Sequence, residues 1–172
     1  MRLRRTVYRA QNPKWSFAPE SGEGAALTGG RFNPRGMKAL YTSARFETAW
    51  LEAQQAFAFK AQPLTLCAYE VDCDDMLDLT DPATRTSQAI ELSDLACAWK
   101  DLATRAIRPP SWILAERLCK AGVAGIMVQS YAAGATPADI NVVFWDWGPA
   151  PPHQVRVLDA EHRLPKNPSS WQ

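Results

Sequence analysis

The sequence lacks the features that mark a membrane protein, a secreted protein or a metalloenzyme. No window approaches the run of about 18 apolar residues that a membrane-spanning helix needs, and no apolar stretch follows the basic run at residues 2–5, as it would in a signal peptide. There are only two histidines and four cysteines, and the cysteines form no CxxC pair. We therefore expect free thiols in a reducing cytoplasm, no bound metal and no membrane association.

The usual nucleotide and hydrolase signatures are missing as well. Gly22-Glu23-Gly24 does not extend to GxGxxG, because Leu27 stands where the third glycine belongs. There is no P-loop lysine motif, no GxSxG and no zinc-protease helix. These absences disfavour kinases, Rossmann dehydrogenases, α/β-hydrolases and metallohydrolases. The formal net charge of +1 gives no reason to expect a nucleic acid as a direct partner.

What is present is typical of one globular domain over residues 1–172. The chain is 47% hydrophobic and 22% charged, and it has neither repeats nor a low-complexity linker. The patterns predict strands at 3–9, 39–41, 65–71, 125–129, 141–145 and 155–158, and helices at 43–59 (capped by Ser43), 92–103 and 112–121. Residues 11–38 carry much of the glycine and proline and predict a long loop. Short strands with a few helices, in no regular βαβ alternation, favour an α+β fold.

Two groups of short motifs resemble the RES-domain family. The first consists of Gly30-Arg31-Phe32-Asn33-Pro34, Gly36, Ala39-Leu40-Tyr41 and Thr48-Ala49-Trp50-Leu51-Glu52. The second consists of Leu118, Gly122, Gly125-Ile126, Val128-Gln129-Ser130-Tyr131 and Asp139-Ile140-Asn141-Val142-Val143-Phe144. The arginine, glutamate and serine that name the family match Arg31, Glu52 and Ser130. Gln129 departs from the pattern, since many members carry proline there. The resemblance runs from Tyr8 to about Leu158.

The resemblance implies an ADP-ribosyltransferase-like fold, with two small sheets and flanking helices around a cleft that holds NAD in a bent shape. NAD is then a co-substrate, without a metal: its nicotinamide–ribose bond breaks, and ADP-ribose passes to water, phosphate or a protein target. The resemblance also implies a toxin of a toxin–antitoxin pair, inhibited by an Xre-type antitoxin that covers the active site. The apolar residues Trp15, Phe17 and Phe32 of the 11–38 loop either contribute contact area to the antitoxin or pack on the body of the protein. The sequence does not choose among the acceptors.

Glu52 and Ser130 match the chemistry of glycosidic cleavage. Breaking the bond leaves positive charge on the sugar, and a nearby carboxylate lowers that barrier. Glu52 is therefore the candidate carboxylate, and its neighbour Glu47 is the candidate for a solvated residue. Ser130 follows a predicted strand and either orients Glu52 or binds the nicotinamide ribose. It is a poor candidate nucleophile, because no histidine lies near it in the sequence.

The remaining candidates would bind the dinucleotide. Arg9 and Arg31 offer guanidinium groups that bind diphosphate oxygens bidentately. If that is the only role of Arg31, its replacement by alanine should leave thermal stability nearly unchanged. Tyr41 would stack on nicotinamide or hydrogen-bond a ribose hydroxyl. Asn141 is the weakest candidate, because an asparagine at a strand start needs no functional reason.

Two alternatives stay open. One is a catalytically inactive module of this fold that only binds its antitoxin. The other is an RNA-acting toxin, which the neutral charge and the lack of an interleaved basic and aromatic patch disfavour.

Overall fold

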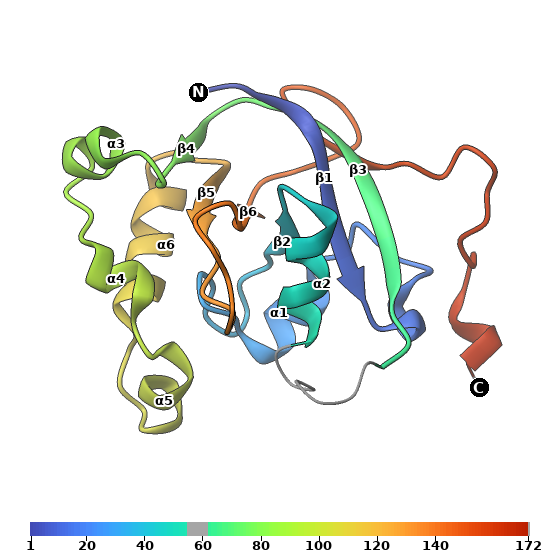
Figure 1. Cartoon of the computed structure of the whole chain (residues 1–172), viewed down its shortest axis with the longest axis horizontal. Coiled ribbons are helices and arrows are strands. Elements are labelled where there is room, and N and C mark those ends of the chain that lie inside the picture. Colours follow the sequence, from blue (N-terminus) through green and yellow to red (C-terminus); the bar gives the residue numbers. More distant parts are fainter. Residues whose placement is uncertain (55–61, 172) are drawn as a thin grey trace.

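The computed structural model describes residues 1–54 and 62–171, and within them the chain forms a mixed α+β fold (Figure 1). The strands are β1 (Leu3–Gln11), β2 (Leu40–Ser43), β3 (Thr65–Cys73), β4 (Met76–Asp78), β5 (Gly125–Gln129), β6 (Ile140–Phe144) and β7 (His153–Val157). The helices are α1 (Glu23–Thr28), α2 (Phe46–Gln54), α3 (Pro82–Ser87), α4 (Leu92–Ala96), α5 (Trp99–Thr104) and α6 (Pro110–Lys120), with short 3-10 turns η1 (Pro13–Trp15) and η3 (Pro168–Trp171). The predicted fold class is confirmed.

The strands form one hydrogen-bonded sheet in the order β4-β5-β6-β2-β1-β3-β7. Strand β1 pairs with β3 along nine residues, whereas the described parts of β1 and β2 share one register pair, Tyr8 with Ser43. The sheet therefore has two halves, β4-β5-β6-β2 and β1-β3-β7, which meet at that single pair. The two small sheets expected from the resemblance are these two halves of a continuous sheet.

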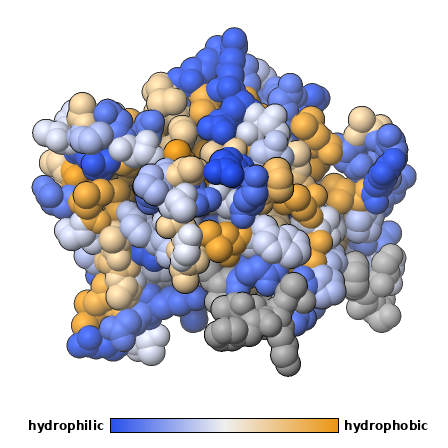
Figure 2. All heavy atoms as spheres, viewed as in Figure 1, coloured by the Kyte–Doolittle hydropathy of each residue, from blue (hydrophilic) through white to orange (hydrophobic). Residues whose placement is uncertain are grey.

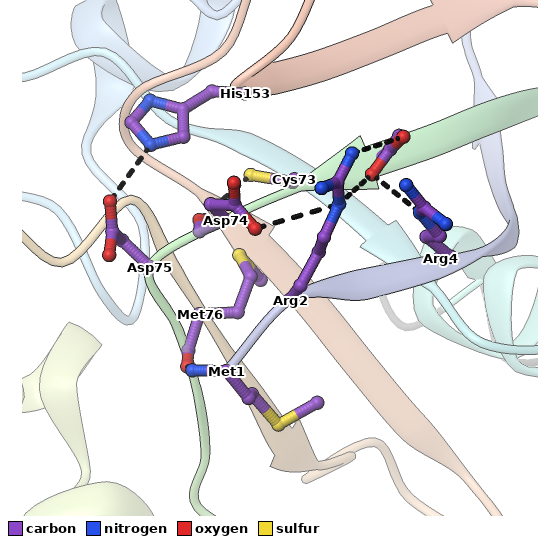
Figure 3. A network of polar contacts seen from close by, with 9 residues as sticks. Met1, Arg2, Arg4, Cys73, Asp74, Asp75, Met76 and His153 are labelled. Atoms are coloured by element: carbon purple, nitrogen blue, oxygen red, sulfur yellow. Dashed lines mark hydrogen bonds and ion pairs between the residues drawn. The ribbon is translucent and has the colours of Figure 1, made fainter.

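The sheet is strongly curled. In a flat sheet, β1 and β4 would lie about 19 Å apart, because four inter-strand spacings separate them. Yet Met1 and Met76, beside the starts of these strands, exchange two backbone hydrogen bonds of 2.8 and 3.0 Å (Figure 3). Arg2 also pairs with Asp74 at 3.6 Å, next to the turn from β3 to β4. These contacts bring the two halves together again at the end of β1 opposite the Tyr8–Ser43 pair.

Two clusters of buried side chains form the core. The first joins both halves of the sheet and comprises Leu3, Val7, Leu40, Cys67, Tyr69, Val71, Cys73, Met76, Ala124, Met127, Val142, Phe144 and Val155. The second lies between the β4-β5-β6-β2 half and the helices around α6, and it comprises Phe32, Ala39, Leu79, Ile90, Leu95, Leu114, Ala115, Leu118, Ile126, Val128 and Val143. Leu114 and Leu118 are four residues apart on α6, so they lie on the same face of the helix, which packs against the sheet. In Figure 1, helices α3 to α6 accordingly lie on the side of β4 and β5.

The surface is mixed. Figure 2 shows small groups of hydrophobic residues scattered among hydrophilic ones on the face viewed there. Large exposed apolar side chains include Leu27, Leu92 and Ile113. No helix within residues 1–54 and 62–171 is long and apolar enough to cross a membrane.

Several predicted elements differ from the structure. The predicted helix 92–103 is two helices, because the chain becomes extended at Cys97 (φ −54°, ψ 149°). Ser43 belongs to β2 rather than capping a helix, and the part of the predicted helix beyond Gln54 lies outside the described residues. The loop 11–38 contains η1 and α1, and the patterns missed β4 and α3. The sequence also predicts that Trp171, in the polar, proline-containing segment 165–172, docks onto the body of the protein, and the structure does not describe this side chain.

Candidate active site

Two adjoining cavities open where β1 and β2 separate. The smaller, of about 230 Å³, is lined by Tyr8, Arg9, Ala10, Tyr41, Thr42, Ser43, Ala49, Glu52, Ala53 and Asn141. The larger, of about 420 Å³, is lined by Arg9, Ala25, Thr28, Gly29, Gly30, Arg31, Phe32, Tyr41, Glu52, Ala53, Trp99, Lys100, Tyr131, Asn141 and Val143. Glu52 lies on the wall that the two cavities share. Every predicted site residue lines a cavity except Ser130, which is buried behind Glu52.

Glu52 projects from α2, and among the residues that the structure describes, Ser130 after β5 and Asn141 in β6 hold its carboxylate. Ser130 Oγ donates to Glu52 Oε1 at 2.6 Å, and Asn141 Nδ2 donates to the same oxygen. Ser130 Oγ in turn accepts from the Ala132 amide at 3.2 Å. The serine hydroxyl is thus engaged as donor and acceptor, which fits the orienting alternative and not a nucleophile.

Ser43 fixes the orientation of Asn141. Its hydroxyl donates to Asn141 Oδ1 at 2.8 Å across the β2–β6 pair. Because a hydroxyl donor faces the carbonyl side of the amide, the NH₂ side must face Glu52. Asn141 is therefore part of the candidate site, although its position at a strand start gave the weakest prediction. The sequence analysis missed Ser43 in this role.

A second network pins α2 to the segment before β6. Thr48 on α2 donates to Asp139 Oδ1 at 2.6 Å, and the amide and hydroxyl of Thr136 both donate to Asp139 Oδ2 at 2.8 Å. The hydrogen bond from Thr48, followed by those from Thr136, lowers the pKa of Asp139 to about 2. The Asp139 carbonyl also accepts from the Ser130 amide at 2.7 Å. This network sets the distance between α2, which carries Glu52, and the residues that hold its carboxylate.

Arg31 lies at the opposite side of the larger cavity and is tied to backbone. Its Nη1 donates to the carbonyls of Leu95 at 3.2 Å and Cys97 at 2.7 Å, and its guanidinium carbon lies 4.6 Å from the centre of the Tyr131 ring. These carbonyls flank the break between α4 and α5, so Arg31 stabilises that break. Arg31 therefore has a structural role besides any role in ligand binding, and these bonds argue against the expectation that Arg31→Ala leaves thermal stability nearly unchanged.

Tyr41 supports the turn that carries Arg31. Its hydroxyl accepts from the Phe32 amide at 2.9 Å and donates to Asn33 Oδ1 at 2.7 Å. Burial raises its pKa above the usual tyrosine value. A Cβ at Gly30 would clash with this hydroxyl, which explains the glycine. The hydroxyl is thus committed to the protein, and the aromatic ring is the part of Tyr41 suited to a ligand.

Arg9 brings a second cation to both cavities. Its Nη1 donates to the carbonyls of Pro19 at 3.0 Å and Ser21 at 3.2 Å. Within the described residues, Arg9, Arg31 and Lys100 bring three cationic side chains to the larger cavity, against one carboxylate, that of Glu52. A guanidinium has five N–H donors, so each arginine keeps donors beyond Nη1. The lining favours an anionic ligand next to a single fixed carboxylate.

The structure also bears on the cysteines and on the 11–38 loop. All four cysteines are free thiols, as expected. No group of three histidine, cysteine or acidic side chains in the described part of the chain could hold a metal ion. Phe32 is buried in the second core cluster, so it cannot offer exposed contact area, whereas Trp15 is 49% exposed.

A family model described as "RES domain" matches residues 6–167, which confirms the resemblance. Among solved structures, the chain is similar to the crystal structure of the M. tuberculosis MbcT–MbcA toxin–antitoxin complex. The identity is 20%, the TM-score is 0.61, and the match covers 92% of this chain and 84% of that chain. At this identity the likeness shows that the two chains share a fold. No curated protein matches the sequence.

Proposed function

Because the chain belongs to the RES-domain family, we propose that it breaks the nicotinamide–ribose bond of NAD and transfers ADP-ribose to an acceptor. The observation that carries this proposal is the position of Glu52. Its carboxylate is fixed by Ser130 and Asn141 on the wall between a small cavity and a larger cation-lined one. That arrangement suits a dinucleotide, because its diphosphate needs cationic partners and its scissile bond needs a nearby carboxylate.

The chemistry needs little more than electrostatics. When the bond breaks, its electron pair leaves with nicotinamide and positive charge develops on the ribose. A carboxylate held in place before the reaction stabilises that charge without reorganising. The acceptor atom then bonds to the sugar carbon, and water or a protein side chain releases its proton to solvent, whereas a phosphate oxygen attacks in its ionised form. Arg9 and Arg31 would bind the diphosphate, and the ring of Tyr41 would pack against nicotinamide. Water, phosphate and a protein side chain all fit this step as acceptors.

We further propose that the protein is the toxin of a toxin–antitoxin pair and acts in the cytoplasm. The structure it resembles is a toxin bound to its antitoxin. An Xre-type antitoxin would place a segment over the cavities near Arg31 and Glu52, with Trp15 offering apolar contact area. The test is competition: raising the NAD concentration should weaken inhibition. Complete inhibition that is indifferent to NAD would mean that the antitoxin acts elsewhere.

Product analysis tests the enzymatic proposal. The purified protein is incubated with NAD in buffer alone, with phosphate, and with cell lysate, and products are identified by mass spectrometry. We expect free nicotinamide in every case, with ADP-ribose, its phosphorylated form or a modified protein identifying the acceptor. The Glu52→Gln variant provides the background. Antitoxin binding with no release of nicotinamide would instead favour the inactive module, and NAD-independent RNA cleavage would favour the RNA-acting toxin.

A further inference from the structure

A third cavity adjoins the candidate site on the side away from Glu52. It measures about 870 Å³ and is lined by Thr28, Gly29, Pro34, Arg35, Trp99, Lys100, Ala103, Thr104 and Trp112. It shares Thr28, Gly29, Trp99 and Lys100 with the larger cavity of the candidate site. The three cavities therefore form a row, with the small one beyond Glu52 at one end and this one, the tryptophan pocket, at the other.

Two indole rings dominate the tryptophan pocket and are held in place. Trp99 and Trp112 have ring centres 6.4 Å apart and planes inclined by 44°. Trp112 Nε1 donates to the Gly30 carbonyl at 2.7 Å, which fixes this ring against the turn that carries Arg31. Trp99 begins α5, directly after the break that Arg31 holds through the Leu95 and Cys97 carbonyls. The Trp112 ring and the start of α5, which carries Trp99, are thus positioned by the candidate site.

The charge of the pocket is positive. Lys100 and Arg35 line it, and no acidic side chain does among the residues that the structure describes. Fixed aromatic faces beside cations suit a nucleotide, because the base stacks on the ring while the phosphate meets the cation. The volume lies within the usual range of ligand pockets, about 300–1,000 Å³.

We propose that the tryptophan pocket binds the adenosine half of NAD, with the purine against Trp99 and with Lys100 near the diphosphate. This inference rests on the proposed function, because Glu52 must lie beside the nicotinamide ribose. The small cavity of about 230 Å³ suits the nicotinamide ring. The adenosine end then extends through the larger cavity to the tryptophan pocket. This pocket therefore determines preference for the dinucleotide over the mononucleotide.

The test compares two substrates that share the scissile bond. NAD has the adenosine half, and nicotinamide mononucleotide lacks it. Trp99→Ala should raise KM for NAD about 10-fold, the usual effect of removing one stacking partner, and should lower kcat/KM for the mononucleotide by a much smaller factor. Trp99→Phe keeps an aromatic face and should restore most of the NAD affinity. Lys100→Ala should raise KM for NAD less, and its effect should shrink with added salt.

A matched pair elsewhere on the chain serves as the control. Lys14 Nζ lies 5.7 Å from the Trp15 ring centre, as Lys100 Nζ lies 5.6 Å from that of Trp99. Lys14 and Trp15 line none of the three cavities. Lys14→Ala and Trp15→Ala should leave KM for both substrates unchanged.

The outcomes separate this inference from the proposed function. Equal effects of Trp99→Ala on both substrates, or no effect on either, would overturn the adenosine pocket while leaving the cleavage activity intact. If the wild-type protein cleaves neither substrate, the proposed function fails. Calorimetric titration with ADP-ribose then decides the pocket alone: binding that Trp99→Ala abolishes and Trp15→Ala retains supports it, and no binding overturns it.

Discussion

The two ends of the candidate site are built from different kinds of contact. At the carboxylate end, Glu52 is held by side chains, Ser130 and Asn141, and Ser43 supports the latter. At the cation end, the Arg31 side chain is held by backbone carbonyls and an aromatic ring. Side-chain partners can be removed without changing the path of the chain, whereas the Arg31 contacts maintain the break between two helices. Substitutions at the carboxylate end should therefore change catalysis without changing stability, whereas substitutions at the cation end should change both.

The largest effect is expected from Glu52→Gln. Glutamine keeps the size of the side chain and removes the negative charge that opposes the ribose cation. We expect kcat for NAD cleavage to fall by about 10²–10³-fold, the range seen when one preorganised electrostatic group is lost. The melting temperature should change little. Glu47→Gln, on the exposed side of the same helix, is the matched control and should retain full activity. Unchanged turnover in Glu52→Gln would refute the assignment of Glu52.

Arg31→Ala should affect binding and stability together. Loss of a charge-assisted contact with the diphosphate should weaken NAD binding by about 1–3 kcal/mol. Loss of the bonds to Leu95 and Cys97 should lower the free energy of unfolding by about 1–2 kcal/mol. Calorimetric titration and chemical denaturation measure the two effects. Arg31→Lys should recover binding only in part, because the bidentate geometry is lost.

Arg45, an exposed arginine paired with Glu47 at 3.3 Å, provides the control for Arg31. Arg45→Ala should change neither NAD binding nor stability measurably. If Arg31→Ala lost affinity at full stability, the contrast between the two ends of the site would not hold.

Ser43→Ala tests the carboxylate end one contact further out. Without the Ser43 hydroxyl, the side-chain carbonyl of Asn141 loses its hydrogen bond. The Asn141 NH₂ group is then no longer directed toward Glu52. We expect kcat to fall about 10-fold, equivalent to about 1.4 kcal/mol, with KM for NAD nearly unchanged, because Ser43 acts through Asn141. A rise in KM without a change in kcat would place Ser43 in ligand binding instead.

Asp139→Asn tests stability and its dependence on pH. The folded-state pKa of Asp139, about 2, lies below the unfolded value of about 3.9. The ionised carboxylate therefore stabilises the fold fully above pH 4, and this contribution disappears as the pH falls toward 2. Asp139→Asn should lower the free energy of unfolding by about 1–2 kcal/mol at pH 7. Denaturation curves of variant and wild type should converge near pH 2, and a constant difference at every pH would contradict this role.

The sequence could predict the elements whose signals are local. The apolar run Gly125–Gln129 predicted β5 with its observed bounds, and the RES-like motifs pointed to Arg31, Glu52 and Ser130, which the fold brings together. It could not predict the partners of Arg31, because carbonyl groups carry no sequence signature. It also missed Ser43, which meets Asn141 98 residues later. That contact depends on the register of β2 with β6.

The long separation between β2 and β6 also has a consequence for the order of assembly. Ser43 and Asn141, as well as Glu52 and Ser130, come together only when distant parts of the chain pair. Pairings of high sequence separation carry a large loop-closure cost and form slowly. A nascent chain that has not yet released residues 130–141 from the ribosome lacks the donors that hold Glu52. Catalytic competence is therefore expected to arise late in synthesis, once β5 and β6 can pair.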